Sequence, residues 1–279
     1  MKIDIKTNQQ RTTWDRLVAT WERADSIESI EGAWVFDHFY PLGGDSSGPC
    51  LEGWTVLAAL AHATNRLLIG TMVNGMPYRH PAVTANMAST VDVISNGRLQ
   101  LGLGAGWNKE EADAYGISLG STLRERMDMF DEGVEAVVRL LTEEQVDFAG
   151  KHHRLTQARN EPKGVQHPHP PIVIGGGGEK RTLRTVARWA QHWNLTPSPV
   201  EVWEHKRSVL RLHCDEIGRD PAEIMCSMMA RFDPDDTEGL YATLAAARDA
   251  GLDKMVVNLP SPHEPGHVDL VAAVADRLD

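Results

Sequence analysis

Residues 172–183 read Ile172-Val173-Ile174-Gly175-Gly176-Gly177-Gly178-Glu179-Lys180-Arg181-Thr182-Leu183. The stretch opens with a short apolar, β-branched run, which is typical of a buried strand, and it ends in a segment of helical period. Four glycines join the two parts. The stretch therefore predicts one βα unit, in which a strand passes through a turn into a helix.

The same unit recurs along the whole chain, because short apolar runs alternate with amphipathic segments as they do in parallel βαβ folds. The expected strands are Lys2–Lys6, Ala33–Asp37, Leu67–Val73, Leu99–Gly104, Ile172–Gly175, His192–Thr196, Met225–Arg231 and Lys254–Leu259. The expected helices are Thr13–Asp25, Trp54–Thr64, Pro81–Ser95, Leu123–Thr142, Lys180–Ala190, Pro199–Ile217, Thr237–Ala250 and Val268–Leu278. Eight such units within 279 residues predict an α/β protein with one closed (β/α)8 TIM barrel, a single domain over residues 1–279.

One connection departs from this rhythm. The segment between Leu141 and Pro171 is too long for a simple αβ loop, and it contains the alternating stretch from Val146 to Leu155. We therefore expect a small inserted hairpin excursion between the fourth and fifth strands.

The composition narrows the classes of partner. With 42% hydrophobic and 24% charged residues, the chain can bury a large core. The formal net charge of −11 argues against a nucleic-acid partner, which would require a basic face. No apolar run has the length of a signal peptide or a membrane span, so we expect a cytoplasmic protein. Neither the three cysteines nor the paired histidines have the spacing of metal ligands, so we expect no metal site.

The ends of the strands are the places to search for a site, because the active sites of α/β barrels lie there. The glycines Gly175–Gly178 lead from a strand into a helix, which gathers backbone N–H groups and a positive helix end at one point. This predicts a phosphate or other anion site, with Lys180, Arg181 and Arg184 adding local positive charge. The alternative is a flexible turn.

His38 follows the second expected strand, and its ring should project into the mouth of the barrel beside Trp107 and Asn108. A histidine there can donate or accept a proton near neutral pH. The alternative is a histidine that only hydrogen-bonds a neighbouring loop.

Other polar residues at strand ends favour structural roles. His80 precedes a proline at an expected helix start, and the pair Glu110-Glu111 begins a helix, where acidic side chains favour the helix dipole. The chain has no Gly-x-Ser-x-Gly elbow, Walker loop or Rossmann fingerprint, which argues against the commonest hydrolase, NTPase and nicotinamide classes.

Several stretches taken together resemble the bacterial luciferase-like superfamily. They are Asp37–Phe39, Gly70–Val73, Tyr78–Val83 and Val91–Trp107, continued by Asn108–Glu111, Leu123–Arg126 and Pro171–Gly178. The blocks Gly104–Asn108 and Gly175–Glu179 are most similar to the branch that uses the deazaflavin coenzyme F-420, whereas relatives elsewhere use FMN. The resemblance implies a TIM barrel of the luciferase-like type, with a non-prolyl cis peptide at Met72–Val73 or the next bond.

The resemblance also implies a function and a set of site residues. The function is hydride transfer between the deazaflavin C5 and a small organic substrate, with His38, Trp107 and Asn108 as catalytic residues. The implied cofactor-binding residues are Asp37, His38, Met72, Val73, Asn74, Gly104, Ala105, Gly106, Trp107, Gly175, Gly176, Gly177, Gly178, Glu179 and Arg181. Trp107 stands where the deazaflavin glucose-phosphate dehydrogenases have a glutamate, which favours an unsaturated or aromatic substrate over a sugar phosphate.

Two other functions stay open. One is a two-component FMN monooxygenase, in which the same mouth would shield reduced FMN during its reaction with oxygen. The other is a non-catalytic barrel that only binds flavin. The resemblance further implies a homodimer through the outer helices that follow the second and third strands.

Overall fold

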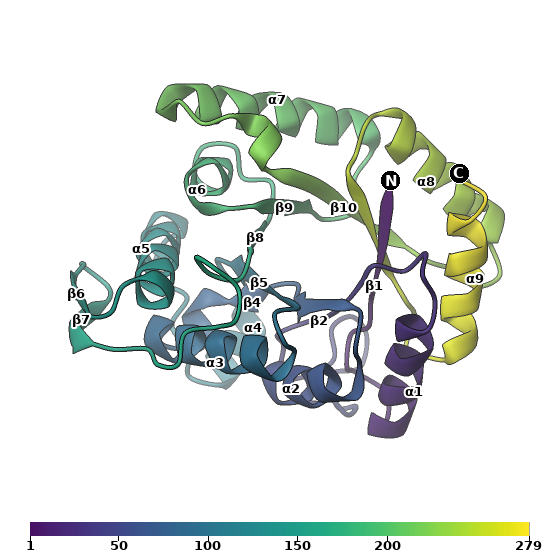
Figure 1. The fold of residues 1–279 in the computed structure, drawn as a ribbon, viewed down its shortest axis with the longest axis horizontal. Helices are drawn as coiled ribbons and strands as arrows, with labels where there is room; N and C mark the ends of the chain where they lie inside the picture. The colour runs from purple at the N-terminus through teal and green to yellow at the C-terminus, as the bar shows by residue number, and fades with distance from the viewer. Residues whose placement is uncertain (279) are drawn as a thin grey trace.

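Residues 1–278 are described by a computed structural model, in which eight parallel strands close into a barrel (Figure 1). The barrel strands are β1 Lys2–Lys6, β2 Gly32–Val35, β3 Leu68–Thr71, β5 Leu99–Gly104, β8 Ile172–Gly175, β9 His192–Leu195, β10 Met225–Arg231 and β11 Lys254–Asn258. Their order is β3-β2-β1-β11-β10-β9-β8-β5, and pairing of β3 with β5 closes the ring. The predicted barrel is therefore confirmed.

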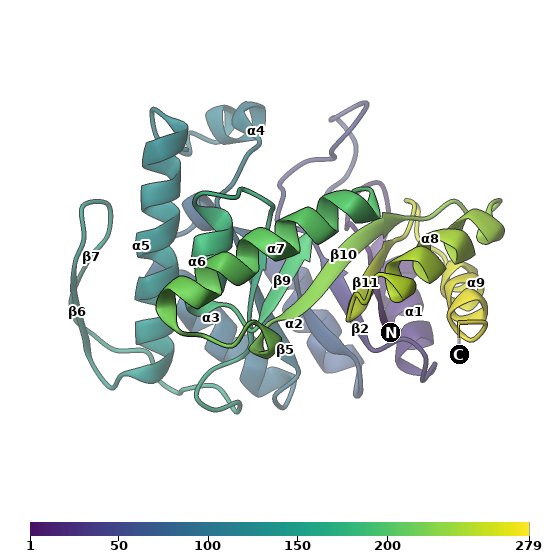
Figure 2. The same ribbon diagram turned by 90° about the horizontal axis from the view of Figure 1, so that it is seen from above.

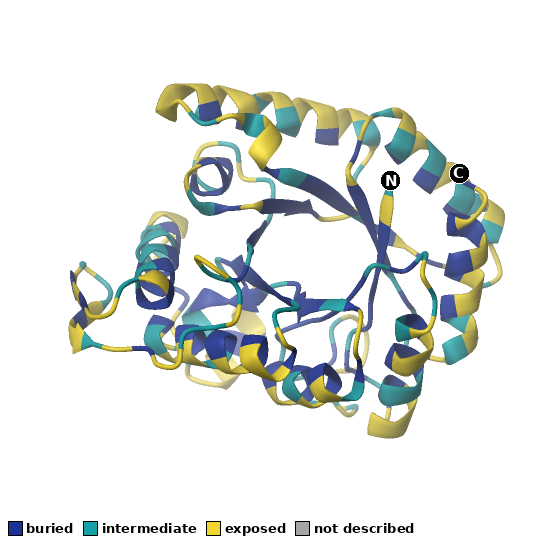
Figure 3. Cartoon of the chain, viewed as in Figure 1, coloured by how far each residue is buried: buried dark blue, intermediate teal, exposed yellow. Residues whose placement is uncertain are grey.

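A helix layer covers the outside of the strands, and Figure 3 shows buried residues on the barrel and on the inner helix faces. The helices are α1 Trp14–Asp25, α2 Gly53–Ala63, α3 Pro81–Ile94, α4 Lys109–Ala114, α5 Leu123–Thr142, α6 Thr182–Trp189, α7 Val200–Ile217, α8 Thr237–Asp249 and α9 Pro265–Ala275. None of the helices within residues 1–278 is both long and apolar enough to cross a membrane.

The third barrel strand is shorter than predicted. Of the expected strand Leu67–Val73, only Leu68–Thr71 forms β3, and an unpredicted two-residue strand, β4 Asn74–Gly75, follows and pairs with the end of β5. The peptide bond between them, Met72–Val73, is cis, as the resemblance implied. The break places Val73 at the mouth of the barrel.

The start of α6 also differs from the prediction. The expected helix began at Lys180, but α6 begins at Thr182, because Arg181 has φ −126° and ψ −59° and is not yet helical. Six residues, 176–181, therefore lie between β8 and the first helical turn, and this lengthens the loop at the mouth.

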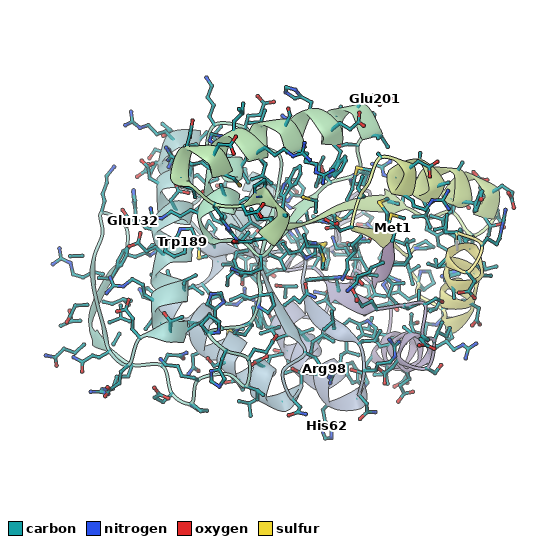
Figure 4. All side chains as sticks on the ribbon, turned by 45° about the horizontal axis from the view of Figure 1, so that its top comes forward. Met1, His62, Arg98, Glu132, Trp189 and Glu201 are labelled. Atoms are coloured by element: carbon teal, nitrogen blue, oxygen red, sulfur yellow. The ribbon has the colours of Figure 1, made fainter. Side chains whose placement is uncertain are left out.

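The predicted hairpin excursion is present between β5 and β8. It consists of β6 Val146–Ala149 and β7 Arg154–Ala158, which pair antiparallel and project from the barrel beside α5 (Figure 2). The Glu132 carboxylate of α5 accepts hydrogen bonds from the amides of Lys151, His152 and His153, so the hairpin tip is held against the helix (Figure 4).

Candidate functional site

A cavity of about 430 Å³ opens at the carboxyl ends of the strands. Seven of the eight barrel strands, or the segments directly after them, contribute to its wall. The lining residues are Lys6, Asn8, Phe36, Asp37, His38, Leu42, Met72, Val73, Gly75, Tyr78, Gly104, Ala105, Gly106, Trp107, Gly175, Gly176, Asn194, Thr196 and Met229. This cavity, which we call the mouth cavity, brings together the second-, third-, fourth- and fifth-strand residues that the sequence predicted.

His38 is held in the mouth cavity by a buried carboxylate. Its Nδ1 lies 2.7 Å from Glu111 Oε2, and the other carboxylate oxygen accepts the Phe39 amide at 2.6 Å. The Tyr78 hydroxyl donates to Glu111 Oε2 at 2.6 Å. Burial would raise the pKa of Glu111, but these hydrogen bonds outweigh burial and lower the pKa. The carboxylate is therefore ionised and accepts a hydrogen bond from His38 Nδ1–H, which leaves Nε2 as the ring nitrogen without a protein partner among residues 1–278.

Tyr78 is a donor in this arrangement and stays protonated. Burial, followed by its hydrogen bond to Glu111, raises the pKa of the Tyr78 hydroxyl. The ring also packs against Phe39, with centroids 5.1 Å apart. Tyr78 thus helps to fix the same Glu111 oxygen that His38 contacts.

Trp107 and Asn108 follow β5 but have different environments. The Trp107 ring packs edge-on against His38, with centroids 5.6 Å apart, and is 64% exposed. It forms an aromatic rim of the mouth cavity. The Asn108 side chain is outside the lining and instead caps α4, since its Oδ1 accepts the Glu111 amide at 3.3 Å. Asn108 is therefore the N-cap of α4, the helix that carries Glu111.

Asp37 and Asn74 hold the framework of the mouth. The Asp37 carboxylate accepts Arg79 Nη1 at 2.8 Å and the Gly75 amide at 3.0 Å. Asn74 Oδ1 accepts Trp54 Nε1 at 2.9 Å, and Asn74 has no exposed surface. Asp37 lines the cavity next to His38, whereas Asn74 does not reach it.

Val73 forms a flat apolar wall that only glycine neighbours permit. A Cβ at Gly104 would lie 2.5 Å from a Val73 methyl, and a Cβ at Gly175 would lie 3.0 Å from the other. Glycine at these two positions lets β5 and β8 approach Val73 closely. The result is a smooth surface on which a planar ring can lie.

A second cavity, of about 560 Å³, lies beside the remaining glycines, and we call it the glycine cavity. It is lined by Leu123, Arg124, Met127, Gly177, Gly178, Glu179, Lys180, Arg181, Thr182 and Lys206. Within the described part of the chain, no backbone amide from Gly177 to Arg181 donates to a protein acceptor. Free N–H donors before a helix are a common anion site.

The cations of the glycine cavity are only partly those that the sequence suggested, since Lys180 lines it with its charge unpaired but Arg181 does not keep a free charge. Arg181 is neutralised by Asp128 and Asp131, at 2.7 and 2.6 Å, so its charge serves to tie α5 to α6. Glu179, which was expected to bind cofactor, accepts Lys206 Nζ at 2.5 Å. Lys180 has no ion-pair partner within residues 1–278.

Arg124, which lies at the start of α5, likewise has no ion-pair partner in the described chain. Neither Arg124 nor Lys206 was predicted, because each lies on a helix far in sequence from the glycines that it approaches in the fold. Only the packing of α5 and α7 beside α6 brings these cations to the glycine cavity.

Sequence reasoning also missed Glu111 and Tyr78. Glu111 was given a helix-dipole role from its position at a helix start, yet its side chain has no exposed surface. A sequence signal existed, since Asn108 and Glu111 have the spacing of a capping residue and the third residue of a helix. Nothing in that spacing shows which loop the carboxylate meets, and here it meets the segment after β2.

Comparisons with known proteins agree with this architecture. A family model described as luciferase-like monooxygenase matches residues 2–268. An uncharacterized protein of Mycobacterium tuberculosis (strain ATCC 25618 / H37Rv) is 33% identical over 172 residues, which cover 59% of this chain and 59% of that protein. The F-420-dependent hydroxymycolic acid dehydrogenase of the same strain is 28% identical over 195 residues, covering 68% of this chain and 51% of that protein. The matched region thus spans between half and three fifths of these curated relatives.

A solved structure extends the likeness over the full length. An F-420-dependent secondary alcohol dehydrogenase in complex with an F-420-acetone adduct superposes with a TM-score of 0.88 at 17% identity, covering 100% of this chain and 99% of that chain. At this identity the likeness concerns the fold. Because the family model covers nearly all of the sequence and the barrel matches, the chain belongs to the luciferase-like monooxygenase family.

Proposed function

We propose that the chain is a coenzyme F-420-dependent oxidoreductase that transfers a hydride between the deazaflavin C5 and a small organic substrate, unsaturated or aromatic. The observation that carries the proposal is that consecutive residues line the two cavities. Gly175 and Gly176 line the mouth cavity, and the next two residues, Gly177 and Gly178, line the glycine cavity. A flat apolar wall for a ring and an anion site for a phosphate are thereby joined by consecutive residues. The name of the mycobacterial dehydrogenase supports the same cofactor.

The residues present fit such a cofactor. The amides from Gly177 to Arg181 would receive its phosphate, and Lys180 and Arg124, which have no ion-pair partner within residues 1–278, would balance its negative charge. Val73, with Met72 beneath it, would support the ring. The deazaflavin would supply or accept the hydride at C5.

His38 is the residue suited to move a proton. Its Nδ1 donates to Glu111, so Nε2 can accept a proton from a substrate hydroxyl or return one to a substrate carbonyl oxygen. Glu111 orients the ring through its hydrogen bond to Nδ1. Trp107 would contact the substrate and reduce the access of water to it.

A two-component FMN monooxygenase is the alternative, favoured by the description of the matched family. The same wall and anion site would hold FMN. Oxygen consumption separates the two functions, because a deazaflavin lacks the N5 nitrogen and reacts poorly with oxygen. Tight flavin binding without turnover on a broad panel of electron acceptors would instead favour a non-catalytic barrel.

The proposal is tested by fluorescence titration of the purified protein with oxidised F-420 and, separately, with FMN, each at low and high salt. We expect tight, salt-sensitive binding of F-420 and weak binding of FMN, since the anionic tail of F-420 meets the cations of the glycine cavity. The double substitution of Arg124→Met and Lys180→Met should weaken F-420 binding and its salt dependence.

Lys151→Met, at the tip of the hairpin, is the matched control and should bind F-420 as the wild type does. A preference for FMN, together with oxygen uptake in the presence of reduced FMN, would overturn the proposal and assign the chain to the monooxygenases.

We also propose that two copies associate through α2 and α3. Within Gly53–Ala63 and Pro81–Ile94 no charged Lys, Arg, Asp or Glu side chain is exposed, whereas Val83, Val93 and Ile94 are 50%, 45% and 42% exposed. His62 projects from the same side (Figure 4). An uncharged outer face of this kind is typical of a surface that is buried between subunits.

A further inference from the structure

The end of β1 places a lysine without a counter-ion in the mouth cavity. Lys6 is only 9% exposed and lines the cavity. Among residues 1–278 its Nζ forms no ion pair, and its single polar contact is Met229 Sδ at 3.9 Å. Burial lowers the pKa of Lys6 to about 8. A buried ammonium group without an anion costs stability, so its presence calls for a ligand that supplies the negative charge.

A second unsatisfied group belongs to the same cavity. Asn194 is 1% exposed, and its Oδ1 is buried without a hydrogen-bond partner. Its Nδ2 donates to Ser227 Oγ at 2.8 Å. The Asn194 oxygen is therefore an acceptor that the protein itself leaves unused, and buried acceptors of this kind are rare.

A chain of hydrogen bonds fixes that orientation of Asn194. His192 Nδ1 lies 3.2 Å from Gln100 Oε1, and His192 Nε2 lies 2.6 Å from Ser227 Oγ. Burial lowers the pKa of His192 to about 3, so the ring is neutral and has one donor and one acceptor. With Nδ1 donating to Gln100, Nε2 accepts the Ser227 hydroxyl, and Ser227 Oγ must accept from the Asn194 amide nitrogen.

Lys6 lies away from the wall that would hold a cofactor ring, whereas Asn194 pairs in register with Gly175 at the edge of that wall. In the closed order of eight strands, β1 is four strands from β8 in either direction, so Lys6 stands across the cavity from Gly175. Met229 on β10 is likewise four strands from β3, which leads to Val73. The space between the two sides is where a substrate would face the ring.

We propose that Lys6 and Asn194 form a subsite that selects a substrate carrying both a carboxylate and a hydrogen-bond donor, as a hydroxy acid does. The inference rests on the proposed function, because it names the substrate class of the same cavity. The carboxylate pairs with the Lys6 ammonium group, and a hydroxyl other than the group that reacts beside His38 donates to Asn194 Oδ1. Both unsatisfied groups are then satisfied by one small molecule.

The test is calorimetric titration with three matched probes, in the presence and absence of F-420. Mandelate carries an aromatic ring, a carboxylate and a hydroxyl; phenylacetate lacks the hydroxyl; mandelamide lacks the charge. For the wild type we expect mandelate to bind most tightly. Lys6→Met should weaken mandelate and phenylacetate by about 10- to 100-fold and leave mandelamide unchanged, because a charged hydrogen bond is lost.

Asn194→Leu should show the complementary pattern. It should weaken mandelate and mandelamide by roughly 2- to 10-fold and leave phenylacetate unchanged, because a neutral hydrogen bond is lost. Lys151→Met is the control for the loss of one positive charge and should change none of the three affinities. Lys6→Met should melt at the same temperature as the wild type or higher, since it removes an unpaired buried charge.

A pH series gives a second readout that is specific to Lys6. Mandelate affinity should fall as the pH rises through about 8, because the ammonium group loses its proton, and Lys6→Met should lack this step. The other ionisable groups that face the cavity or lie beneath it in the barrel are Asp37, His38, Tyr78, Asp4, Glu31, His192 and Lys254. All of them are retained in Lys6→Met, so a step that persists in that variant contradicts the assignment.

The outcomes separate this inference from the proposed function. If mandelate bound in a Lys6-dependent way and F-420 did not bind, the proposed cofactor would be wrong and the proposed subsite would be supported. Equal binding of mandelate and mandelamide to the wild type, or an unchanged mandelate affinity in Lys6→Met, overturns the subsite. A loss of F-420 affinity in Lys6→Met would overturn it as well, because Lys6 would then belong to the cofactor.

Discussion

The Glu111 side chain has no exposed surface, and its carboxylate accepts three hydrogen bonds. The donors are the His38 ring, the Phe39 amide and the Tyr78 hydroxyl. Glu111→Gln keeps the volume but places an NH2 group opposite donors. We expect the free energy of unfolding to fall by about 1–3 kcal/mol. The rate of hydride transfer should fall roughly tenfold or more with F-420 affinity retained, because His38 loses its orientation. Urea unfolding and stopped-flow absorbance measure these two effects.

Glu110→Gln is the control, because Glu110 is the exposed neighbour on the same helical turn. It should change neither quantity by more than about 0.5 kcal/mol. If both variants behaved alike, Glu111 would have no special role in holding His38.

The same carboxylate predicts a pH dependence of stability. Burial would raise the pKa of Glu111, but its hydrogen bonds outweigh burial and lower the pKa on folding. The stabilisation is therefore fully present above the unfolded pKa of about 4.3 and is lost as the pH falls through the lower folded value. The difference in unfolding free energy between the wild type and Glu111→Gln should be widest above about pH 5 and narrow below about pH 4. A difference that is constant from pH 3 to pH 7 would contradict this account.

At the scale of elements, three arginines at the amino-terminal end of the barrel each cap the carboxyl-terminal end of a helix from a preceding βα unit. Arg66 donates to carbonyls at the end of α1, Arg98 to those of α2, and Arg219 to those of α6. Arg98 is the fullest case, since its guanidinium reaches the carbonyls of Ala61 and Thr64 at 2.6 and 2.8 Å (Figure 4). Cationic donors at helix ends satisfy carbonyls that the helix leaves free.

Arg98→Met should therefore destabilise the fold by about 2–3 kcal/mol, because several partly buried carbonyls lose a charged donor. Hydrogen exchange should quicken first in the last turn of α2 and in β3. Arg159→Met is the control, since that side chain is 55% exposed and its polar contacts within residues 1–278 are with the side chains of Glu144 and Gln145. It should change stability by less than about 0.5 kcal/mol. Equal effects of the two substitutions would show that the hydrogen bonds from Arg98 to the end of α2 contribute nothing to the stability of the fold.

The elements were largely predictable, because strand and helix identity follows from apolar periodicity along the chain. The residues at which the strands and helices begin and end were less predictable. Apolar periodicity did not report the end of β3 at Thr71, and only the family resemblance pointed to the Met72–Val73 bond. Nor did it report that α6 begins at Thr182, since the helical pattern continues through Arg181, whose φ and ψ are not helical.

The residues of the candidate site were likewise only partly predictable from the sequence. His38 and Trp107 were predictable, because residues that follow parallel strands meet at one end of a barrel. Glu111 bonds His38 across 73 residues of sequence, and Arg181 is neutralised by aspartates of α5, about 50 residues earlier. Such pairings arise from helix packing, which the sequence pattern of any one segment does not contain.

For the whole molecule, the barrel is closed by the first and last strands. Lys254 on β11 has no exposed side-chain surface and contacts Asp4 on β1 at 2.9 Å and Glu31, just before β2, at 2.7 Å. This ion pair inside the barrel joins the two ends of the chain, so the strands that frame Lys6 depend on residues about 250 positions apart. On the outside of the barrel, the exposed apolar side chains Val83, Val93 and Ile94 lie on α3, beside α2, on a face without exposed Lys, Arg, Asp or Glu.

That surface gives the last prediction. We expect the protein to elute with twice the mass of one chain in light scattering, because the uncharged faces of α2 and α3 would be buried against each other in a two-fold dimer. The double substitution of Val83→Glu and Ile94→Glu should yield monomers, since four like charges would meet at one interface. Leu212→Glu on α7, where the leucine is 62% exposed, is the matched control and should remain dimeric. A monomeric wild type, or a double variant that stays dimeric, would show that the contact lies elsewhere, and in the second case the outer faces of the remaining helices would be the surfaces to test.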